Sequence, residues 1–147
     1  MPGITFDTSV FVSYKPVEFP AGFLMSAVVI QEILAAAVDE TEMRRWSATF
    51  RAYEREGRLI APTSDDWLMA GKVLCWLARG RKKSAGGKSP RRAPEAKQRM
   101  AYDTLIAVSA RRVGATVVTV NWDDFRAIQY YCDVKIQRAS DFFRQSR

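Results

Sequence analysis

Short apolar runs alternate along the chain with longer stretches in which apolar residues recur every three or four positions. The short runs predict β-strands at residues 3–7, 23–27, 59–62, 116–120 and 134–136. The longer stretches predict helices over residues 10–14, 26–38, 40–56, 65–78 and 99–113, and a further helix starts after residue 121. Strands that alternate with helices in this way are typical of an α/β protein with a mainly parallel sheet.

The length of 147 residues fits one domain, and 48% apolar with 27% charged residues fits a folded globular chain. The most apolar window, residues 19–38, is long enough to be considered as a membrane span. It contains Gln31 and Glu32, and a charge in mid-membrane costs at least about 2.5 kcal/mol, so we expect a strand followed by a helix and no membrane association. The first residues have no basic region and carry Asp7 within an apolar run, so no signal peptide is expected.

The absence of histidine narrows the chemistry that the chain can perform. Without histidine, Ser-His and Cys-His dyads and most zinc sites are excluded, which leaves carboxylates, hydroxyls, Lys, Arg or a bound metal. The two cysteines, Cys75 and Cys132, form no C-x-x-C motif, and we expect two buried, reduced thiols in a cytoplasmic protein.

Polar residues follow two of the predicted strands at the ends where parallel sheets bind ligands. Asp7 follows the first strand, and Asn121, Asp123 and Asp124 follow the strand "TVVTV", with Trp122 between them. These side chains are therefore expected to lie at one edge of the sheet. Each also has a simpler explanation, because Asp7 suits a helix cap and Asp123 or Asp124 suits a turn or an N-cap.

Two further acids lie on predicted helices among apolar neighbours. Glu32 shares its side of the helix with Val28, Val29, Ala35 and Ala36, and Asp103 lies between Ala107 and Ala110. The solvent side of the second helix is marked instead by Thr104, Arg111 and Arg112. A buried carboxylate must be protonated, ion-paired or bound to a metal. A salt bridge for Glu32 and a favourable helix dipole for Asp103 remain as alternatives.

Convergence of Asp7, Glu32, Asp103 and the Asp123/Asp124 pair predicts a site for Mg²⁺ or Mn²⁺. Oxygen ligands without nitrogen or sulfur suit these hard cations. Two such ions about 3.5–4 Å apart activate water and stabilise the leaving oxyanion in phosphodiester cleavage. The residues therefore favour a metal-dependent nuclease.

The same residues resemble the PIN domain of VapC-type toxins. The resemblance rests on "FDTSVFV" at 6–12, "SAVVIQEIL" at 26–34, "AYDTLIAVSARRVGATVVTVNWDDF" at 101–125, and their order. The last piece is the most specific, with its T-x-N-x-x-D-F pattern. Residues 39–98 match only loosely. The resemblance implies a three-layer α/β/α sandwich with a mainly parallel central sheet, a single PIN-like nuclease domain over residues 1–147, and a Mg²⁺- or Mn²⁺-dependent endoribonuclease.

The resemblance also assigns roles to individual residues. Asp7, Glu32 and Asp103 match the family's acids, and Asp124 is the expected fourth metal ligand and catalytic acid. Asn121 stands where other PIN domains have an aspartate, so it is expected, with Thr8, to contact substrate. Inhibition by a small antitoxin is implied, and a homodimer is left open. The alternatives are a catalytically silent PIN-like module that binds RNA or a protein, and a nuclease that cuts DNA.

The positive charge is concentrated in one segment, residues 79–99, which departs from the family pattern. It holds nine Lys or Arg and one acid, whereas the remaining chain holds 14 basic and 15 acidic residues. It contains Gly86, Gly87, Pro90 and Pro94, so its middle is expected to be a flexible loop. The segment is either a solvated loop or an arm that contacts RNA phosphates. The second interpretation assigns substrate binding to these residues: Arg81, Lys82, Lys83, Arg91 and Arg92.

Aromatic residues appear elsewhere in the chain. The basic segment itself has none, so base stacking must come from another part of the protein. Trp46, Phe50, Tyr53 and Trp67 are either core residues or the wall of a groove for an amphipathic helix of the antitoxin.

Overall fold

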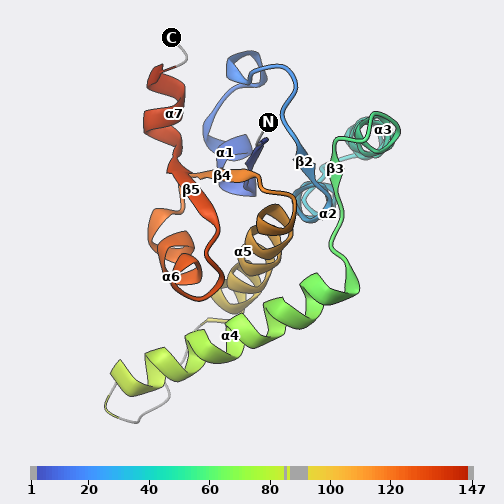
Figure 1. The fold of residues 1–147 in the computed structure, drawn as a ribbon. Helices are drawn as coiled ribbons and strands as arrows, with labels where there is room; N and C mark the ends of the chain where they lie inside the picture. The colour runs from blue at the N-terminus through green and yellow to red at the C-terminus, as the bar shows by residue number, and fades with distance from the viewer. Residues whose placement is uncertain (1–2, 85, 87–92, 146–147) are drawn as a thin grey trace.

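The computed structural model describes residues 3–84, 86 and 93–145 (Figure 1). In chain order, the strands are β1 (Ile4–Phe6), β2 (Met25–Ser26), β3 (Leu59–Ile60), β4 (Thr116–Thr119) and β5 (Lys135–Arg138). The helices are α1 (Thr8–Ser13), α2 (Ala27–Ala35), α3 (Glu40–Arg55), α4 (Ser64–Ser84), α5 (Pro94–Arg112), α6 (Trp122–Cys132) and α7 (Ala139–Gln145), with a 3-10 turn at Pro16–Glu18.

All strand pairs are parallel. The order β1-β4-β5 forms one sheet, with Ile4 opposite Thr116, and β2 pairs with β3 in a second sheet. A parallel bridge between Thr5 and Leu24 joins the two sheets edge to edge. The side chain of Thr5 strengthens this junction, because its hydroxyl donates to the Leu24 carbonyl at 2.8 Å.

The alternation of side chains along β4 shows how the layers form. Val117 packs into the larger core, together with buried residues of α2, α4, α5 and α6. Its neighbour Val118 points to the opposite face, where Phe6 packs with Phe142 and Phe143 of α7. Helices therefore cover both faces of the sheet, and the three-layer α/β/α sandwich with a mainly parallel sheet is confirmed.

Two helices reach further into the basic segment than the sequence predicted. α4 continues to Ser84 rather than ending near residue 78, and α5 begins at Pro94 rather than at residue 99. Proline is favoured in the first turn, where its missing N–H costs nothing, and the cations in the last turn of α4 oppose the negative end of its dipole. Arg91 and Arg92, and most of the expected loop between the helices, lie outside the described residues.

The burial of α5 corrects another expectation. Thr104 was assigned to the solvent side, yet it is 0% exposed, and every residue from Asp103 to Ala110 is buried. The helix lies against α2, α4, α6 and β4, so apolar contact surrounds it over most of its length. A helix enclosed in this way has no amphipathic period from which a solvent face could be read.

Other expectations have mixed outcomes. Gly114 has φ +72° after α5, the left-handed conformation that closes a helix, as predicted. Cys132 is buried, but Cys75 is exposed, so the expectation of two buried thiols is wrong for Cys75. Among the helices of the described ranges, none is long and apolar enough to cross a membrane.

Candidate functional site

The carboxyl ends of β1 and β4 lie side by side, and the acids that follow them meet there. Asp7 follows β1, Asn121 and Asp124 follow β4, Glu32 projects from α2, and Asp103 projects from α5. Asp7, Glu32, Asp103 and Asn121 line a cavity of about 460 Å³, and Asp124 contacts two of its lining residues, Asn121 and Arg99. The cavity is lined by Asp7, Thr8, Ser9, Val12, Glu32, Arg99, Asp103, Val120 and Asn121.

Asp7 is the most deeply placed of the carboxylates, with 1% of its surface exposed. It occupies the N-cap position of α1, but its side chain makes no cap hydrogen bond. Instead it accepts hydrogen bonds from the Ser9 hydroxyl at 2.7 Å and the Thr119 hydroxyl at 2.8 Å. Burial raises the pKa of Asp7 from 3.8 to about 6, although these hydrogen bonds act in the opposite direction. Helix capping therefore does not explain this side chain.

Asp103 sits in the middle of α5, because that helix begins at Pro94. It is too far from the first turn for the helix dipole to explain it. The residue is 4% exposed, and its carboxylate accepts a hydrogen bond from the Asn121 amide at 2.8 Å. Burial, together with the charges of Asp7, Glu32 and Asp124, raises the pKa of Asp103 to about 8, although the Asn121 bond acts in the opposite direction.

Glu32 is half-buried at the side of the cavity. The Thr8 hydroxyl donates to its carboxylate at 2.7 Å, which ties α1 to α2. Its pKa is raised, first by burial and then by the charge of Asp7, while the Thr8 bond lowers it. None of the ion pairs found in the described ranges involves Glu32, so the salt-bridge alternative has no support in this part of the chain.

Of the residues after β4, Asn121 and Asp124 turn toward Asp103, whereas Asp123 turns toward solvent. Asn121 donates from one amide nitrogen to both Asp103 and Asp124, at 2.8 and 3.0 Å. Asp124 also lies 3.8 Å from the Arg99 guanidinium. Asp123 is exposed, as its expected solvent-facing position requires. The turn after β4 therefore directs an amide and one carboxylate toward Asp103.

Three residues of the site were not singled out as site residues from the sequence. Ser9 and Thr119 hold Asp7 from two sides, and Ser9 also accepts the Val120 N–H at 3.2 Å. Arg99 lines the cavity, although from the sequence it was only one of nine cations in the basic segment. Thr119 had a usable signal, because it opens the T-x-N-x-x-D-F pattern.

Of the predicted phosphate-binding cations, the three that the structure describes do not line this cavity. Arg81 lies on α4 and lines a different hollow, between α4 and α6, while Lys82 and Lys83 are exposed in the last turn of α4. Arg91 and Arg92 lie outside the described residues. Arg99 is the cation of the basic segment that the structure brings beside the acids.

The ligand atoms available at the cavity are of the type that a divalent cation prefers. The groups that line the cavity supply carboxylate, amide and hydroxyl oxygens and no nitrogen or sulfur ligand, as Mg²⁺ and Mn²⁺ prefer. Burial raises the pKa values of Asp7, Glu32 and Asp103, and a cation bound among these carboxylates would lower them again. Nevertheless, within residues 3–84, 86 and 93–145, no three acidic, histidine or cysteine side chains are grouped closely enough to enclose an ion.

The aromatic residues of α3 have a mixed placement. Trp46, Phe50 and Tyr53 are half-buried against the core, and Trp46 and Tyr53 also line a separate hollow of about 600 Å³ beside Phe23. Trp67 is 61% exposed on α4 and lines neither this hollow nor the acid-lined cavity. Trp46 and Tyr53 thus combine the two expected roles, Phe50 has only the core role, and Trp67 has neither.

No protein-family model matches the sequence, and no curated protein matches it. Solved structures, in contrast, match nearly the whole chain. A chain of DNA-bound VapBC from Salmonella typhimurium gives a TM-score of 0.57 at 17% identity, covering 95% of this chain and 99% of that one. A chain of VapBC-1 from nontypeable Haemophilus influenzae gives 0.57 at 19% identity, covering 93% and 98%. A chain of FitAB bound to an IR36 DNA fragment gives 0.56 at 18% identity, covering 92% and 94%. The chain therefore has the PIN-like α/β/α fold of the VapBC and FitAB structures, as its sequence motifs predicted.

Proposed function

We propose that this protein is a divalent-metal-dependent endoribonuclease and the toxin of a toxin–antitoxin pair. The observation that carries the proposal is that Asp7, Glu32 and Asp103, from three different parts of the chain, line one open cavity, with Asp124 linked to Asp103 through Asn121. A fold gains no stability from gathering buried carboxylates, because each raises the pKa of its neighbours. Such an arrangement is consistent with a site kept for its chemistry.

Asp7 and Asp103 are the residues that would hold the principal cation, with Glu32 and Asp124 completing its surroundings. A bound Mg²⁺ or Mn²⁺ supplies Lewis-acid activation of water and charge stabilisation at the scissile phosphate. Each carboxylate oxygen has two lone pairs, so the hydrogen bonds to Asp7 and Asp103 leave sites for a ligand. Because the acids do not yet form a closed group, binding requires these side chains to draw together.

The surrounding residues of the chain orient the acids and the substrate. Ser9 and Thr119 fix the Asp7 carboxylate from both sides, and Asn121 links Asp103 to Asp124. Arg99, with 57% of its side chain exposed, lies at the cavity and can contact a phosphate of the substrate. Thr8 holds Glu32 in place, so its expected contact with substrate is proposed only as a secondary role.

The test is cleavage of single-stranded RNA by the purified protein with Mg²⁺, with Mn²⁺ and with excess EDTA. We expect cleavage with either metal, none in EDTA, and a loss of at least about 100-fold in Asp103→Asn. Asp123→Asn is the matched control, because it removes the same charge from an exposed position of α6. Full activity in EDTA, or an unimpaired Asp103→Asn, would exclude the metal mechanism. A DNA oligomer of the same sequence tests the rival substrate.

We place the antitoxin at the hollow beside α3, where Trp46 and Tyr53 line an aromatic wall that also includes Phe23. Arg45 and Arg58 also line it, so an amphipathic helix with acidic residues would fit its chemistry. The test is co-expression with the product of the adjacent reading frame. Trp46→Ala should weaken that complex, whereas Trp67→Ala, on an exposed part of α4, should not.

A further inference from the structure

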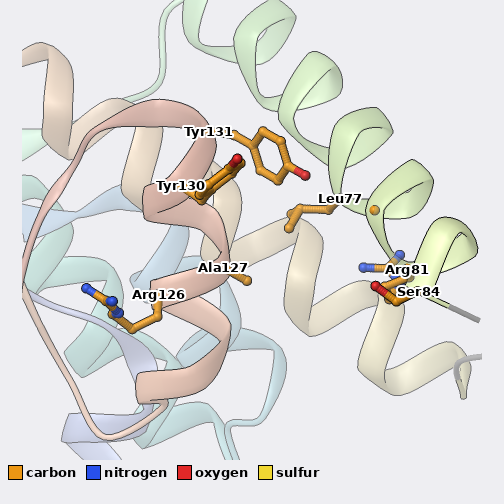
Figure 2. Close-up of a pocket in the computed structure, with 8 residues that line it drawn as sticks. Leu77, Arg81, Ser84, Arg126, Ala127, Tyr130 and Tyr131 are labelled. Atoms are coloured by element: carbon orange, nitrogen blue, oxygen red, sulfur yellow. The ribbon is translucent and has the colours of Figure 1, made fainter.

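A third hollow, of about 740 Å³, lies between the C-terminal half of α4 and one side of α6. Residues from both helices line it, among them Leu77, Arg81, Ser84, Arg126, Tyr130 and Tyr131 (Figure 2). In Figure 1, α4 crosses beneath α5 and α6, and its last turns extend beyond them. The exposed wall of those turns and the side of α6 leave an open groove.

Aromatic rings form the α6 wall of this groove. Tyr130 is 83% exposed, and its ring lies edge-on to Tyr131 with 4.9 Å between the ring centres. Tyr131 in turn lies 5.9 Å from Trp76 on α4, which continues the row across to the other helix. Gly80 allows this approach, because a Cβ atom there would lie 3.1 Å from the Tyr131 hydroxyl. An exposed tyrosine at the edge of a row of rings offers a face to a planar ligand.

The charge of the groove is positive. Arg81 and Arg126 line it, and Lys82 and Lys83 complete the last turn of α4. None of the described residues that line it is acidic. A second copy of this protein would bring the same cations against one another in a symmetric dimer, whereas a polyanion would neutralise them.

The groove is connected to the acid site through α6. Asp124, Ala127 and Tyr131 are spaced i, i+3 and i+7, so they lie along one face of that helix. Seven residues of helix span roughly 10 Å, a distance that a few nucleotides of a single strand can bridge. At the acid end of this helix, Asp124 lies 3.8 Å from Arg99, which lines the cavity.

We propose that the groove between α4 and α6 binds single-stranded RNA beside the cleavage position, with a base stacked on Tyr130 and phosphates held by Arg81 and Arg126. This inference rests on the proposed ribonuclease function and adds a subsite to it. The groove supplies the aromatic side chains that the basic segment lacks. Stacking is indifferent to base identity, so this subsite adds affinity without defining a recognition sequence.

The test measures binding of a 12-nucleotide oligouridylate to the full-length protein in EDTA, where the metal-dependent reaction is silent. Tyr130→Ala should weaken binding by roughly 5- to 150-fold, the range for loss of one base–aromatic stack. Tyr130→Phe keeps the ring and should bind like the wild type. An abasic oligomer of equal length should bind wild type and Tyr130→Ala equally. Arg81→Ser should weaken binding of both oligomers. It should also reduce the slope of log affinity against log salt concentration by about one.

Matched controls lie outside the groove. Trp67→Ala removes an exposed ring from the first turn of α4, and Arg44→Ser removes an exposed cation from α3. Both should leave RNA affinity unchanged. Equal affinity of Tyr130→Ala and wild type, no RNA binding by the wild type, or conversion of a dimer to a monomer by Tyr130→Ala would overturn the subsite. If RNA binds through Tyr130 but is not cleaved with any metal, the proposed ribonuclease function is wrong and the proposed subsite is still supported.

Discussion

Asn121 donates a hydrogen bond to Asp103 across 2.8 Å and so links the end of β4 to the middle of α5. This bond lowers the pKa of Asp103 against the stronger effects of burial and neighbouring charge. We therefore expect Asn121→Ala to raise the pKa of Asp103 above its value of about 8. Carbon-13 NMR titration of the aspartate carboxyl groups in metal-free protein measures this directly.

Gln129→Ala is the control for that titration. It removes an amide from α6, the helix that begins directly after Asn121, but that amide donates to the Val134 carbonyl rather than to a carboxylate. The pKa of Asp103 should stay at its original value in this variant. A pKa that does not move in Asn121→Ala would mean that the amide has no electrostatic role in the site.

Metal-free protein should lose stability as pH rises toward 8. Asp7 and Asp103 have folded-state pKa values of about 6 and about 8, both above the value of 3.8 expected in the unfolded chain. Between those limits the unfolded chain has released protons that the folded chain still holds, so rising pH favours unfolding. For each group, the free energy of unfolding should fall by up to about 1.4 kcal/mol per pH unit between its unfolded-state pKa and its folded-state pKa. Urea unfolding in EDTA from pH 5 to pH 8 tests this.

Asp103→Asn should flatten the upper part of that profile, from pH 6 to pH 8, because the amide does not titrate. The variant should also be more stable than the wild type at pH 8, since it no longer buries a charge. Asp123→Asn should keep the wild-type slope, because Asp123 is exposed. If the free energy of unfolding has the same dependence on pH in wild type and Asp103→Asn, burial does not raise the pKa of Asp103 as argued. Saturating Mg²⁺ should restore stability to the wild type at pH 8.

Asp124 should matter more for cleavage than Asp123. Asp124 accepts a hydrogen bond from Asn121 and lies beside Arg99, whereas Asp123 is exposed. Loss of a supporting group around a metal site commonly costs 10–100-fold, so we expect about this loss of RNA cleavage in Asp124→Ala and almost none in Asp123→Ala. Equal, negligible effects in initial-rate assays would show that the acids after β4 only form a turn.

Arg112 should be a stability residue without a role in catalysis. It ion-pairs with the nearly buried Asp66 at 2.8 Å and donates to the Ala61 carbonyl, which fastens α5 to α4. Arg112→Ala leaves the Asp66 carboxylate without its cation, although the Thr63 N–H still donates to it. We expect a loss of about 1–3 kcal/mol in urea unfolding. Arg111→Ala, at an exposed position one residue earlier, should stay within about 0.5 kcal/mol.

The positions of the acids were predictable because strand ends and helix faces follow from local sequence. Asp7 follows a short apolar strand, and the apolar residues around Glu32 exclude a fully solvated position for that carboxylate. The parallel topology then predicts that Asp7 and Glu32 lie close together. The hydrogen bonds that hold them were not predictable in the same way. Thr119 meets Asp7 only through the pairing of β1 with β4, a long-range contact that no local pattern specifies.

The prediction failed where tertiary packing overrides local pattern. Thr104 looked like a surface residue, but α5 is enclosed by other helices and buries it. Helix α7 was missed because seven residues are too short for a clear period; its two phenylalanines are ordered by packing on the sheet. The paired tyrosines of α6 gave no signal either, since their significance depends on how far α4 extends.

The hydrogen bond between Asp7 and Thr119 joins residues 112 positions apart. A ribosome makes Asp7 well before Thr119, because more than a hundred residues separate them. Until β4 emerges, β1 has no neighbour on that side, Asp7 lacks one of its two hydroxyl donors, and Asn121 and Asp124 do not yet exist. A nascent chain therefore cannot assemble the acid cluster. If the cluster cuts RNA as proposed, the order of synthesis alone keeps the protein harmless to the messenger that encodes it until residues 119–124 have been made.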